Sequence, residues 1–305
     1  MRMCVVANRQ AGSSQRGETL FAELALRKDV VLHLPETPGE ARDLVAGAAD
    51  DGFDMVVAAG GDGTIHTVVN ALAGQFDRVR FGVIPLGTGN DFSRTLAIPD
   101  DPLQALTLLT EGTEQALDLI GVEAGTRVEY CVNMAAGGYA GQMQSALPDL
   151  KKQWGPLGYL MGAFTTLPDL TEYDTRIAFD ESPSERMTII NLIAGNGRTA
   201  AGGHRLAPLA NPQDGLLDVI ILEYVPLVNL AGLALQYVVG NFLEHEQVRF
   251  RRARRLRVTS KPPMMFELDG ELFSDEPLTF TVEPGVLRTI VGPEYVADID
   301  QAAKP

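Results

Sequence analysis

The chain has 305 residues, of which 45% are hydrophobic and 21% are charged, so it is long enough for two domains and has the composition of a globular protein. Its formal net charge of −15 argues against nucleic acid as a partner and against electrostatic attraction of the whole molecule to anionic membranes. It lacks the roughly 20 consecutive apolar residues of a membrane-spanning helix. The N-terminal apolar run is too short for a signal peptide, so we expect a cytoplasmic protein.

Short apolar runs alternate with helix-like patterns in the first third of the chain. The segment Thr37-Pro38-Gly39-Glu40 supplies a helix N-cap, a proline at the first helical position and a glutamate three residues after the cap. The alternation predicts a parallel sheet with helices on both faces. The expected strands are 3–7, 30–34, 55–59 and 81–84, and the expected helices are 19–26, 38–49, 64–72, a short helix from 91, and 102–110.

From about residue 114, β-rich runs separated by turn residues indicate a β-sandwich. We expect an α/β domain at 1–114, which the tail 292–305 either completes or leaves as a frayed end, and a β-sandwich domain at 115–291. Both cysteines, Cys4 and Cys131, fall in strand-like runs and are expected to be buried and reduced. The expected strands are 116–122, 127–134, 175–179, 187–194, 217–223, 254–259, 264–268, 278–282 and 286–291.

Two glycine clusters, at 58–64 (Ala-Ala-Gly-Gly-Asp-Gly-Thr) and 85–91 (Pro-Leu-Gly-Thr-Gly-Asn-Asp), each follow a predicted strand and precede a predicted helix. Consecutive backbone N–H groups at such turns form a concavity that binds phosphate. A plain strand-to-helix turn needs one glycine, whereas the first cluster has three. The pair therefore predicts a nucleotide site and favours phosphoryl transfer. The residues expected to build it are Gly60, Gly61, Gly63, Thr64, Gly87, Thr88, Gly89 and Asn90.

Two carboxylates in these loops have more than one interpretation. Asp62 would repel phosphate unless it binds Mg²⁺, directly or through water, or accepts a hydrogen bond from the ribose or from a loop N–H. Asp91 is equally well explained as a helix cap or as a ligand contact, and Asn90 as a cap.

These loops, together with later segments, resemble the diacylglycerol kinase catalytic domain, in the lipid kinase family that includes bacterial diacylglycerol, sphingosine and ceramide kinases. The resemblance covers nearly the whole chain. It implies a three-layer, Rossmann-like and NAD-kinase-like N-terminal domain that binds ATP, with lipid in the cleft between it and a C-terminal β-sandwich. The later segments are Gly195-Asn196-Gly197-Arg198, Gly202-Gly203, Asp214-Gly215-Leu216-Leu217-Asp218 and Leu268-Asp269-Gly270-Glu271.

The resemblance also implies which residues contact the nucleotide. The first strand–loop reads Asn8-Arg9-Gln10-Ala11-Gly12 where the family has Asn-Pro-x-x-Gly, and His66-Thr67 stands where the family has Asn-Glu, which removes a carboxylate. Capping alone explains Thr37 as well as an ATP contact does. The implied and candidate contacts together are Asn8, Gly12, Thr37, Gly60, Gly61, Asp62, Gly63, Thr64, His66, Thr67, Thr88 and Asn90.

Phosphoryl transfer to an alcohol needs a base that takes the hydroxyl proton. The turn Asp269-Gly270-Glu271 offers two carboxylates, and the resemblance implies that it supplies this base; Asp269 and Glu271 are equal candidates, and Asp62 is the third catalytic candidate. A solvated hairpin turn is the alternative. The resemblance also implies a structural Mg²⁺ held by Asp214 and by carbonyls near Asn211 and Leu216, with Asp218 structural.

Lipid and membrane contacts are expected from two kinds of sequence. The apolar segments 156–167 and 227–243 are either core or the wall of a lipid pocket. The basic run Arg249–Arg257 is either a solvated edge strand or a contact with anionic headgroups, which would make the protein peripheral at the membrane.

The sequence thus predicts an ATP- and Mg²⁺-dependent lipid kinase that phosphorylates the hydroxyl of diacylglycerol or a similar lipid alcohol. The alternatives are an NAD kinase, which shares Gly-Gly-Asp-Gly-Thr, and a nucleotide- or lipid-binding regulator without turnover. The four histidines show no metal-ligand spacing, although His66 adjoins the first loop. A homodimer is compatible with the sequence.

Overall fold

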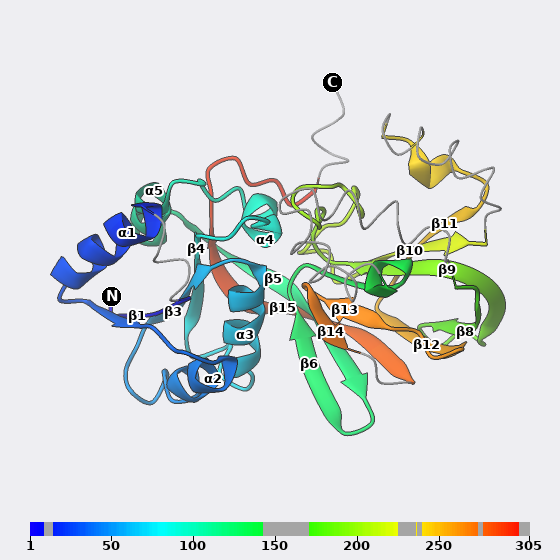
Figure 1. Cartoon of the computed structure of the whole chain (residues 1–305), viewed down its shortest axis with the longest axis horizontal. Helices are drawn as coiled ribbons and strands as arrows, with labels where there is room; N and C mark the ends of the chain where they lie inside the picture. Colours follow the sequence, from blue (N-terminus) through cyan, green and yellow to red (C-terminus); the bar gives the residue numbers. More distant parts are fainter. Residues whose placement is uncertain (9–14, 143–170, 225–235, 237–239, 274–276, 299–305) are drawn as a thin grey trace. The chain divides into compact units, whose positions relative to one another are not determined.

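The computed structural model describes residues 1–8, 15–142, 171–224, 236, 240–273 and 277–298. It divides into two compact units, coloured along the sequence in Figure 1. The first unit comprises Met1–Leu119, Gly197–Gly215 and the segment from Glu283 onward, and the second comprises Ile120–Asn196 and Leu216–Val282. Residues 197–215, which the sequence analysis assigned to the C-terminal domain, therefore belong to the first unit.

The first unit is built on a parallel sheet. β1 (Met3–Ala7) pairs with β2 (Val30–His33) on one side and β3 (Met55–Gly60) on the other, and β4 (Arg80–Pro85) pairs with β3. The end of β15 (Leu278–Val291) adds a further parallel neighbour to β4 at Thr289. Every residue of β1 and β3 is buried, as expected for a parallel sheet that is covered on both faces.

Helices cover this sheet in two layers (Figure 1). α1 (Gln15–Leu26) packs with α5 (Pro102–Glu111), and α2 (Pro38–Ala46) packs with α3 (Asp62–Ala71). α2 begins where the sequence predicts, because Thr37 Oγ1 accepts the Glu40 N–H at 3.2 Å and Pro38 occupies the first turn. α4 (Asp91–Thr95) is a short helix after β4. The predicted three-layer α/β fold is confirmed.

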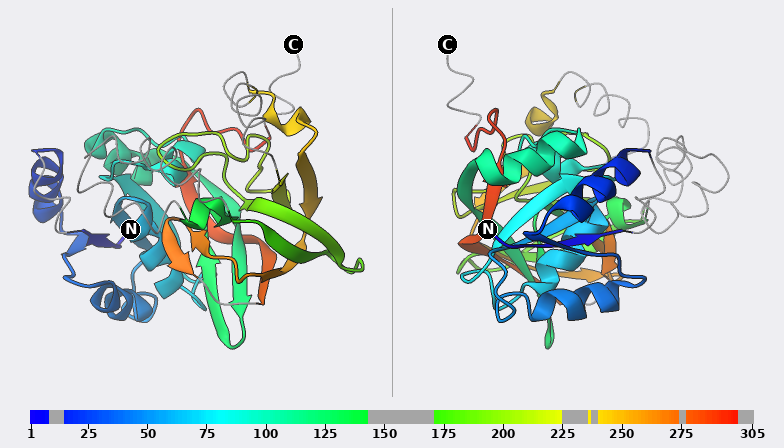
Figure 2. Two further views of the ribbon diagram at one scale, coloured as in Figure 1. Left: turned by 45° about the vertical axis from the view of Figure 1, so that its right-hand side comes forward. Right: turned by 90° about the vertical axis from the view of Figure 1, so that its left-hand side faces the viewer.

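The second unit is a β-sandwich in which β9 (Glu185–Gly195) pairs with different strands along its length. Its first half pairs with β8 (Tyr173–Phe179), and its second half pairs with β7 (Met134–Gly138) and β10 (Leu217–Glu223) (Figure 2). Large side chains such as Phe266 and Phe280, whose ring centroids lie 5.3 Å apart, fill the core. The other strands are β5 (Thr113–Ala124) with β6 (Arg127–Cys131), β11 (Val248–Ala253) on β10, β13 (Phe266–Leu268) on β7, β14 (Glu271–Phe273) on β13, and β12 (Arg255–Lys261) between β8 and β15.

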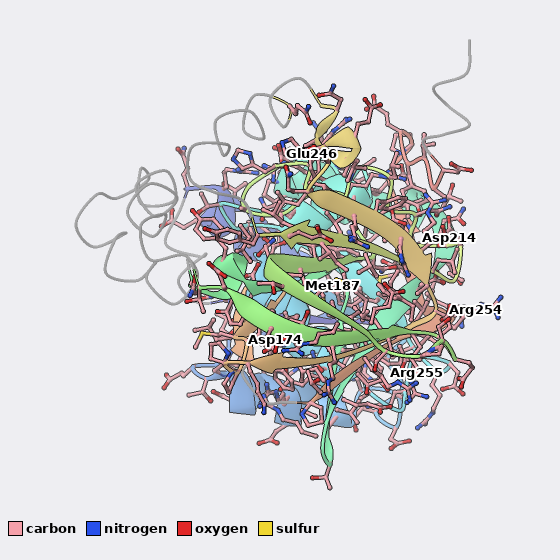
Figure 3. All side chains as sticks on the ribbon, turned by 90° about the vertical axis from the view of Figure 1, so that its right-hand side faces the viewer. Asp174, Met187, Asp214, Glu246, Arg254 and Arg255 are labelled. Atoms are coloured by element: carbon pink, nitrogen blue, oxygen red, sulfur yellow. The ribbon has the colours of Figure 1, made fainter. Side chains whose placement is uncertain are left out.

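Figure 3 looks onto strands β8, β9 and β12 of this unit, with Asp174, Met187 and Arg255 labelled. The strands alternate between buried and exposed residues, and β12 shows this most regularly, with Leu256, Val258 and Ser260 buried. The charged side chains of β12 therefore share one outer face.

Some predicted elements differ from the structure. The strand expected at 127–134 is broken into β6 and β7, because the N–H groups of residues 132–134 bind a side chain instead of a neighbouring strand. The strands expected at 278–282 and 286–291 are one strand, β15, which passes through Gly285 at φ +63°. The segment 156–167 and most of the helix expected at 227–243 lie outside the described residues. Cys4 and Cys131 are buried and neither forms a disulfide, as predicted.

Candidate active site

The two glycine loops of the first unit touch through their backbones. The first joins β3 to α3 and the second joins β4 to α4. A Cβ atom on Gly87 would lie 2.5 Å from the Cα of Gly61, and one on Gly60 would lie 2.3 Å from the Oγ1 of Thr64. Glycine is therefore required at 87 by the contact between the loops, where a side chain would force them apart, and at 60 by the Thr64 side chain within the first loop.

The first loop leads into the N-terminus of α3. Gly61 is the N-cap residue, and no side chain caps the helix; its carbonyl accepts the N–H groups of Thr64 and Ile65 at 3.0 and 3.1 Å. The backbone amides at the start of a ten-residue helix form a site that suits an anion. Thr88 is exposed at the tip of the second loop. The arrangement suits a bound phosphate chain.

Asp62 connects the two loops. Its Oδ1 accepts the Phe92 N–H at 3.3 Å, at the start of α4, and its Oδ2 lies 2.8 Å from where a Cβ on Gly89 would stand. The structure shows Asp62 accepting an N–H in the first turn of α4, just after the second loop. This contact holds the second loop against the first.

Asn90 shapes the second loop from within. Its Oδ1 accepts the Gly87 N–H at 3.0 Å and its Nδ2 donates to the Gly87 carbonyl at 2.9 Å, while its backbone adopts φ +53°. Asn90 precedes α4 as its N-cap residue, but its side chain makes no capping hydrogen bond. Its buried amide therefore fixes the shape of the loop.

The remaining predicted nucleotide contacts differ in accessibility. Asn8 is exposed at the end of β1, and Thr37 is exposed at the start of α2. His66 is only 2% exposed and lies beside Asn70, so it would have to move to reach a ligand. Thr67 donates from its Oγ1 to the Gly63 carbonyl at 2.9 Å. Gly12 lies outside the described residues.

Asp91 has a role that the sequence analysis did not foresee. Its buried carboxylate accepts the N–H groups of Gly202 and Gly203 at 2.8 and 2.7 Å, and Arg94 lies 3.6 Å from its Oδ1. Asp91 is thus not the helix cap, and it ties segment 197–215 to α4. The Gly202-Gly203 pair was the available signal, because such a pair can present two consecutive N–H groups to one carboxylate.

The predicted metal turn is held by a second buried carboxylate, Asp118, which sequence reasoning missed because it lies within an apolar strand. Its Oδ2 accepts the Gly215 N–H at 2.7 Å and its Oδ1 accepts the Gly285 N–H at 2.8 Å. Burial raises the pKa of Asp118, and the two N–H groups partly offset that effect.

Asp214 itself is exposed, and its N–H donates to the Asn211 carbonyl at 3.4 Å. A carboxylate with neighbouring carbonyls is an oxygen donor set, which fits Mg²⁺. Leu216 lies two residues after Asp214 and is the first residue of the second segment of the second unit. Within the described residues there is no cluster of three or more His, Cys, Asp or Glu side chains suited to a metal, so carbonyls and water would have to complete the site.

In the second unit, Asp269 is enclosed by donors. Its Oδ2 accepts the Val132 N–H at 2.8 Å, and its Oδ1 accepts the N–H groups of Asn133 and Met134 at 3.0 and 3.1 Å and the Cys131 thiol at 3.0 Å. Burial, followed by the charge of Asp269 and the bond to it, raises the pKa of Cys131 well above its usual value. The thiol therefore stays protonated and acts as a donor.

The hairpin after Asp269 presents the second carboxylate. Asp269 and Gly270 have φ values of +50° and +92°, as a tight Asp-Gly hairpin turn requires, and Glu271 is exposed at the start of β14. Asn196 holds the 131–134 loop in place, because its Nδ2 donates to the Val132 carbonyl at 2.8 Å. The structure thus separates the two candidates: Asp269 is bound within its unit, and Glu271 is accessible.

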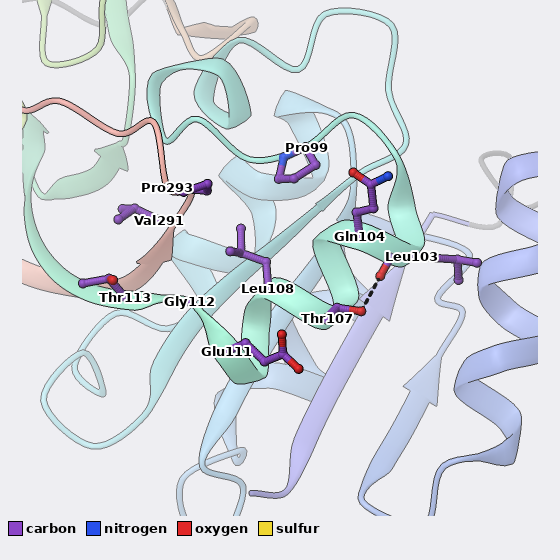
Figure 4. A pocket seen from close by; sticks show the side chains of 10 residues that line it. All are labelled: Pro99, Leu103, Gln104, Thr107, Leu108, Glu111, Gly112, Thr113, Val291 and Pro293. Carbon is purple, nitrogen blue, oxygen red and sulfur yellow. Dashed lines mark hydrogen bonds between the residues drawn. The ribbon is translucent and has the colours of Figure 1, made fainter.

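Asp218 is structural, as predicted: it is 1% exposed and forms an ion pair with Arg252 at 2.8 Å. Away from the predicted residues, a groove of about 560 Å³ lies beside α5 (Figure 4). Pro99, Leu108, Val291 and Pro293 give it apolar walls, and none of the predicted site residues lines it.

Comparison with known proteins finds family matches in both units. The diacylglycerol kinase catalytic domain profile matches residues 2–122, and the YegS C-terminal NAD kinase beta sandwich-like domain profile matches residues 133–291. A diacylglycerol kinase from Staphylococcus saprophyticus is 32% identical over 237 residues, covering 77% of this chain and 76% of the relative. A probable YegS-like lipid kinase from Pseudomonas aeruginosa is 34% identical over 287 residues, covering 94% and 92%.

Solved structures agree on the fold. A putative diacylglycerol kinase from Bacillus anthracis has a TM-score of 0.80 at 21% identity and covers 97% of this chain and 98% of its own. An NAD kinase from Archaeoglobus fulgidus in complex with ATP has a TM-score of 0.54 at 15% identity, covering 96% and 94%. The family predicted from the sequence is confirmed by the two profiles and the curated relatives. The chain belongs to the family of diacylglycerol kinases and YegS-like lipid kinases.

Proposed function

We propose that this kinase transfers the γ-phosphoryl group of ATP to the hydroxyl of diacylglycerol or a similar lipid alcohol. The contact between the two glycine loops carries the proposal, because it brings the second loop against the start of α3, whose first backbone amides have no side-chain cap and suit a phosphate. The curated relatives, which are named as diacylglycerol and lipid kinases, support the acceptor class. The structural likeness to an NAD kinase in complex with ATP supports the nucleotide.

In this proposal the first unit binds and orients the triphosphate. The amides at the start of α3 and the tip of the second loop at Thr88 bind the phosphates, while Asp62 and Asn90 hold the loops in shape. Rigid placement matters because phosphoryl transfer depends mainly on positioning and charge stabilisation. Asp62 acts as a positioning residue through its bond to the Phe92 N–H.

The second unit supplies the base, for which we favour Glu271 over Asp269. A base needs an accessible oxygen that can accept the proton of the substrate hydroxyl. Both oxygens of Asp269 already accept hydrogen bonds from the 131–134 loop, whereas Glu271 is exposed. Asp269 then acts as a positioning residue that fixes the turn preceding Glu271.

The turn at Asp214 would hold Mg²⁺, with the Asn211 and Leu216 carbonyls as further oxygen donors, and Asp118 would keep this turn in place through the Gly215 N–H. A bound Mg²⁺ would supply positive charge near the turn. Direct ligation of a metal by Asp62 is a separate proposal, in which Oδ2 would face the metal while Oδ1 accepts the Phe92 N–H.

The alternatives from the sequence make different predictions. An NAD kinase would phosphorylate NAD and ignore lipid, and a regulator would bind ATP or lipid without turnover. Incubation of the purified chain with γ-labelled ATP, Mg²⁺ and a panel of diacylglycerol, sphingosine, ceramide and NAD separates all three. Labelled phosphatidic acid is the expected product; label in NAD alone, or ATP binding with no labelled product, would overturn the proposal.

A further inference from the structure

The outer face of strands β8, β9 and β12 gathers positive charge in a chain whose net charge is −15. Arg176 on β8 lies across from Arg186 on β9 and from Thr259 on β12. Arg257 is two residues from Thr259, so Arg176 and Arg257 are diagonal neighbours on the same face, within reach of one ligand. Arg255 and Lys261 share the outward register of β12.

Asp174, a carboxylate on this face, is already bound to an arginine. Asp174 accepts two hydrogen bonds from Arg186, at 2.8 and 2.7 Å, and this bonding is the main reason that the pKa of Asp174 is lowered. Within the described residues, neither Arg176 nor Arg257 forms an ion pair with a carboxylate. The charge of Arg176 also acts on Asp174, as a smaller cause of its lowered pKa, although the two form no ion pair. Among the described residues, this face thus holds two guanidinium groups that are not ion-paired.

Other arginines of the basic run form ion pairs with carboxylates of the neighbouring strands. Arg249 pairs with Glu223, and Arg251 pairs with Glu185 at 2.7 Å and lies over the Phe179 ring. Arg252 pairs with the buried Asp218. In the part of the chain that the structure describes, the basic run therefore divides into ion-paired arginines on β11 and arginines on β12 that form no ion pair.

Arg176 and Arg257 line an open groove of about 470 Å³. Its hydroxyl groups come from Ser182, Ser184, Thr259 and Thr279, and Pro183 and Pro277 also line it. Guanidinium groups pair with phosphate through two parallel hydrogen bonds, and hydroxyls add further donors. The volume exceeds that of a bare phosphate and lies in the range of small-ligand pockets.

We propose that this arginine groove (Arg176 and Arg257 with the four hydroxyl residues) binds the phosphate of an anionic phospholipid headgroup at a bilayer surface. Charge complementarity selects this occupant, because the acidic remainder of the molecule is repelled by such a bilayer while this face is attracted. None of the residues assigned to nucleotide, base or metal lines the groove, so the inference goes beyond the proposed catalytic function.

Sedimentation of the full chain with vesicles tests this directly. The wild-type chain should bind vesicles of phosphatidylglycerol and phosphatidylcholine in equal parts, and not vesicles of phosphatidylcholine alone. The double variant Arg176→Gln/Arg257→Gln should lose affinity on the order of thirtyfold, since each arginine near an anionic surface contributes roughly five- to sixfold. Both residues are exposed, so the fold should persist, and circular dichroism checks this.

The matched control is Arg249→Gln/Arg251→Gln, which changes the net charge equally but removes arginines that are already paired. Its loss of vesicle binding should be much smaller. Equal losses of vesicle binding in the two double variants would show general charge attraction and overturn the groove assignment. The assignment would also be overturned if the groove variant bound as tightly as the wild type, or if the wild type did not bind anionic vesicles. In a further arm, sn-glycerol 3-phosphate is added at the same concentration of phosphate groups as the lipid. If it releases the protein from the vesicles, the groove binds a soluble phosphate ester, and the lipid assignment is overturned.

Discussion

Gly61 and Gly87 meet backbone to backbone, so that a Cβ on Gly87 would stand 2.5 Å from the Gly61 Cα and 2.8 Å from the Asn90 Oδ1. This contact makes the two glycine loops one structural element. The shape that would hold a phosphate chain thus depends on both loops together, and a substitution in either loop should shift the backbone of the other.

The substitution Gly87→Ala tests this coupling. The added methyl group has backbone on one side and a buried amide on the other, so the loops must separate; we expect a loss of about 1–3 kcal/mol in the free energy of urea unfolding and weaker ATP binding. Gly47→Ala is the control, because the added Cβ would lie at an ordinary contact distance of 3.7 Å from the Asp51 Oδ2, and the φ of −99° at Gly47 suits alanine. Gly87→Ala with unchanged ATP affinity would separate the loop contact from nucleotide binding.

Thr37 provides a test between capping and ligand contact. Thr37→Ala should cost about 1 kcal/mol of stability, because the Glu40 N–H loses its acceptor, and Thr37→Asp should restore the cap. If Thr37 also contacts ATP, the added carboxylate of Thr37→Asp repels the phosphates and raises the KM for ATP while stability stays normal. An unchanged KM in the Asp variant would leave Thr37 as a cap alone.

The sequence predicted the local parts of this structure well. The N-cap at Thr37 and the glycine loops after β3 and β4 depend on neighbouring residues, which a local pattern can reveal. The family resemblance, carried by short motifs, was confirmed over both units. The positions of Gly61 and Gly87 were found, although their contact with each other was not.

What the sequence did not reveal depends on residues far apart in the chain. Asp269 binds N–H groups 135 to 137 residues away, which breaks a predicted strand into β6 and β7, and Asp91 binds Gly202 and Gly203. Asp118 was overlooked because an isolated carboxylate in an apolar strand gives no local sign of its partners. A periodic pattern identifies an element, but it does not identify which distant amides a buried carboxylate will accept.

Cys4 predicts a pH dependence of stability. Burial, with a smaller effect of Asp51, raises its pKa from 9.0 to about 11. Between these values the unfolded chain releases a proton that the folded chain retains, so stability falls as pH rises from 9.0 toward about 11, by about 2–3 kcal/mol in total. Cys4→Ala should lose stability less steeply over this range in urea unfolding. Parallel curves for the two proteins would contradict the prediction.

Asp269 is expected to matter for stability more than Glu271. In Asp269→Asn the side-chain amide turns an N–H group toward donors of the 131–134 loop, which leaves at least one donor without an acceptor and costs about 1–3 kcal/mol. Glu271→Gln alters an exposed side chain and should change the free energy of unfolding by less than about 0.5 kcal/mol. Urea unfolding of the two variants compares them directly.

The identity of the base is tested most directly by the rate of phosphoryl transfer from γ-labelled ATP to diacylglycerol, measured for the wild type and for Glu271→Gln with the affinity for a non-hydrolysable ATP analogue alongside. Loss of the base should lower kcat by roughly 10²–10⁴-fold while nucleotide affinity and stability stay normal. A Glu271→Gln enzyme that keeps the wild-type kcat, beside a stable Asp269→Asn enzyme that has lost it, would contradict the account.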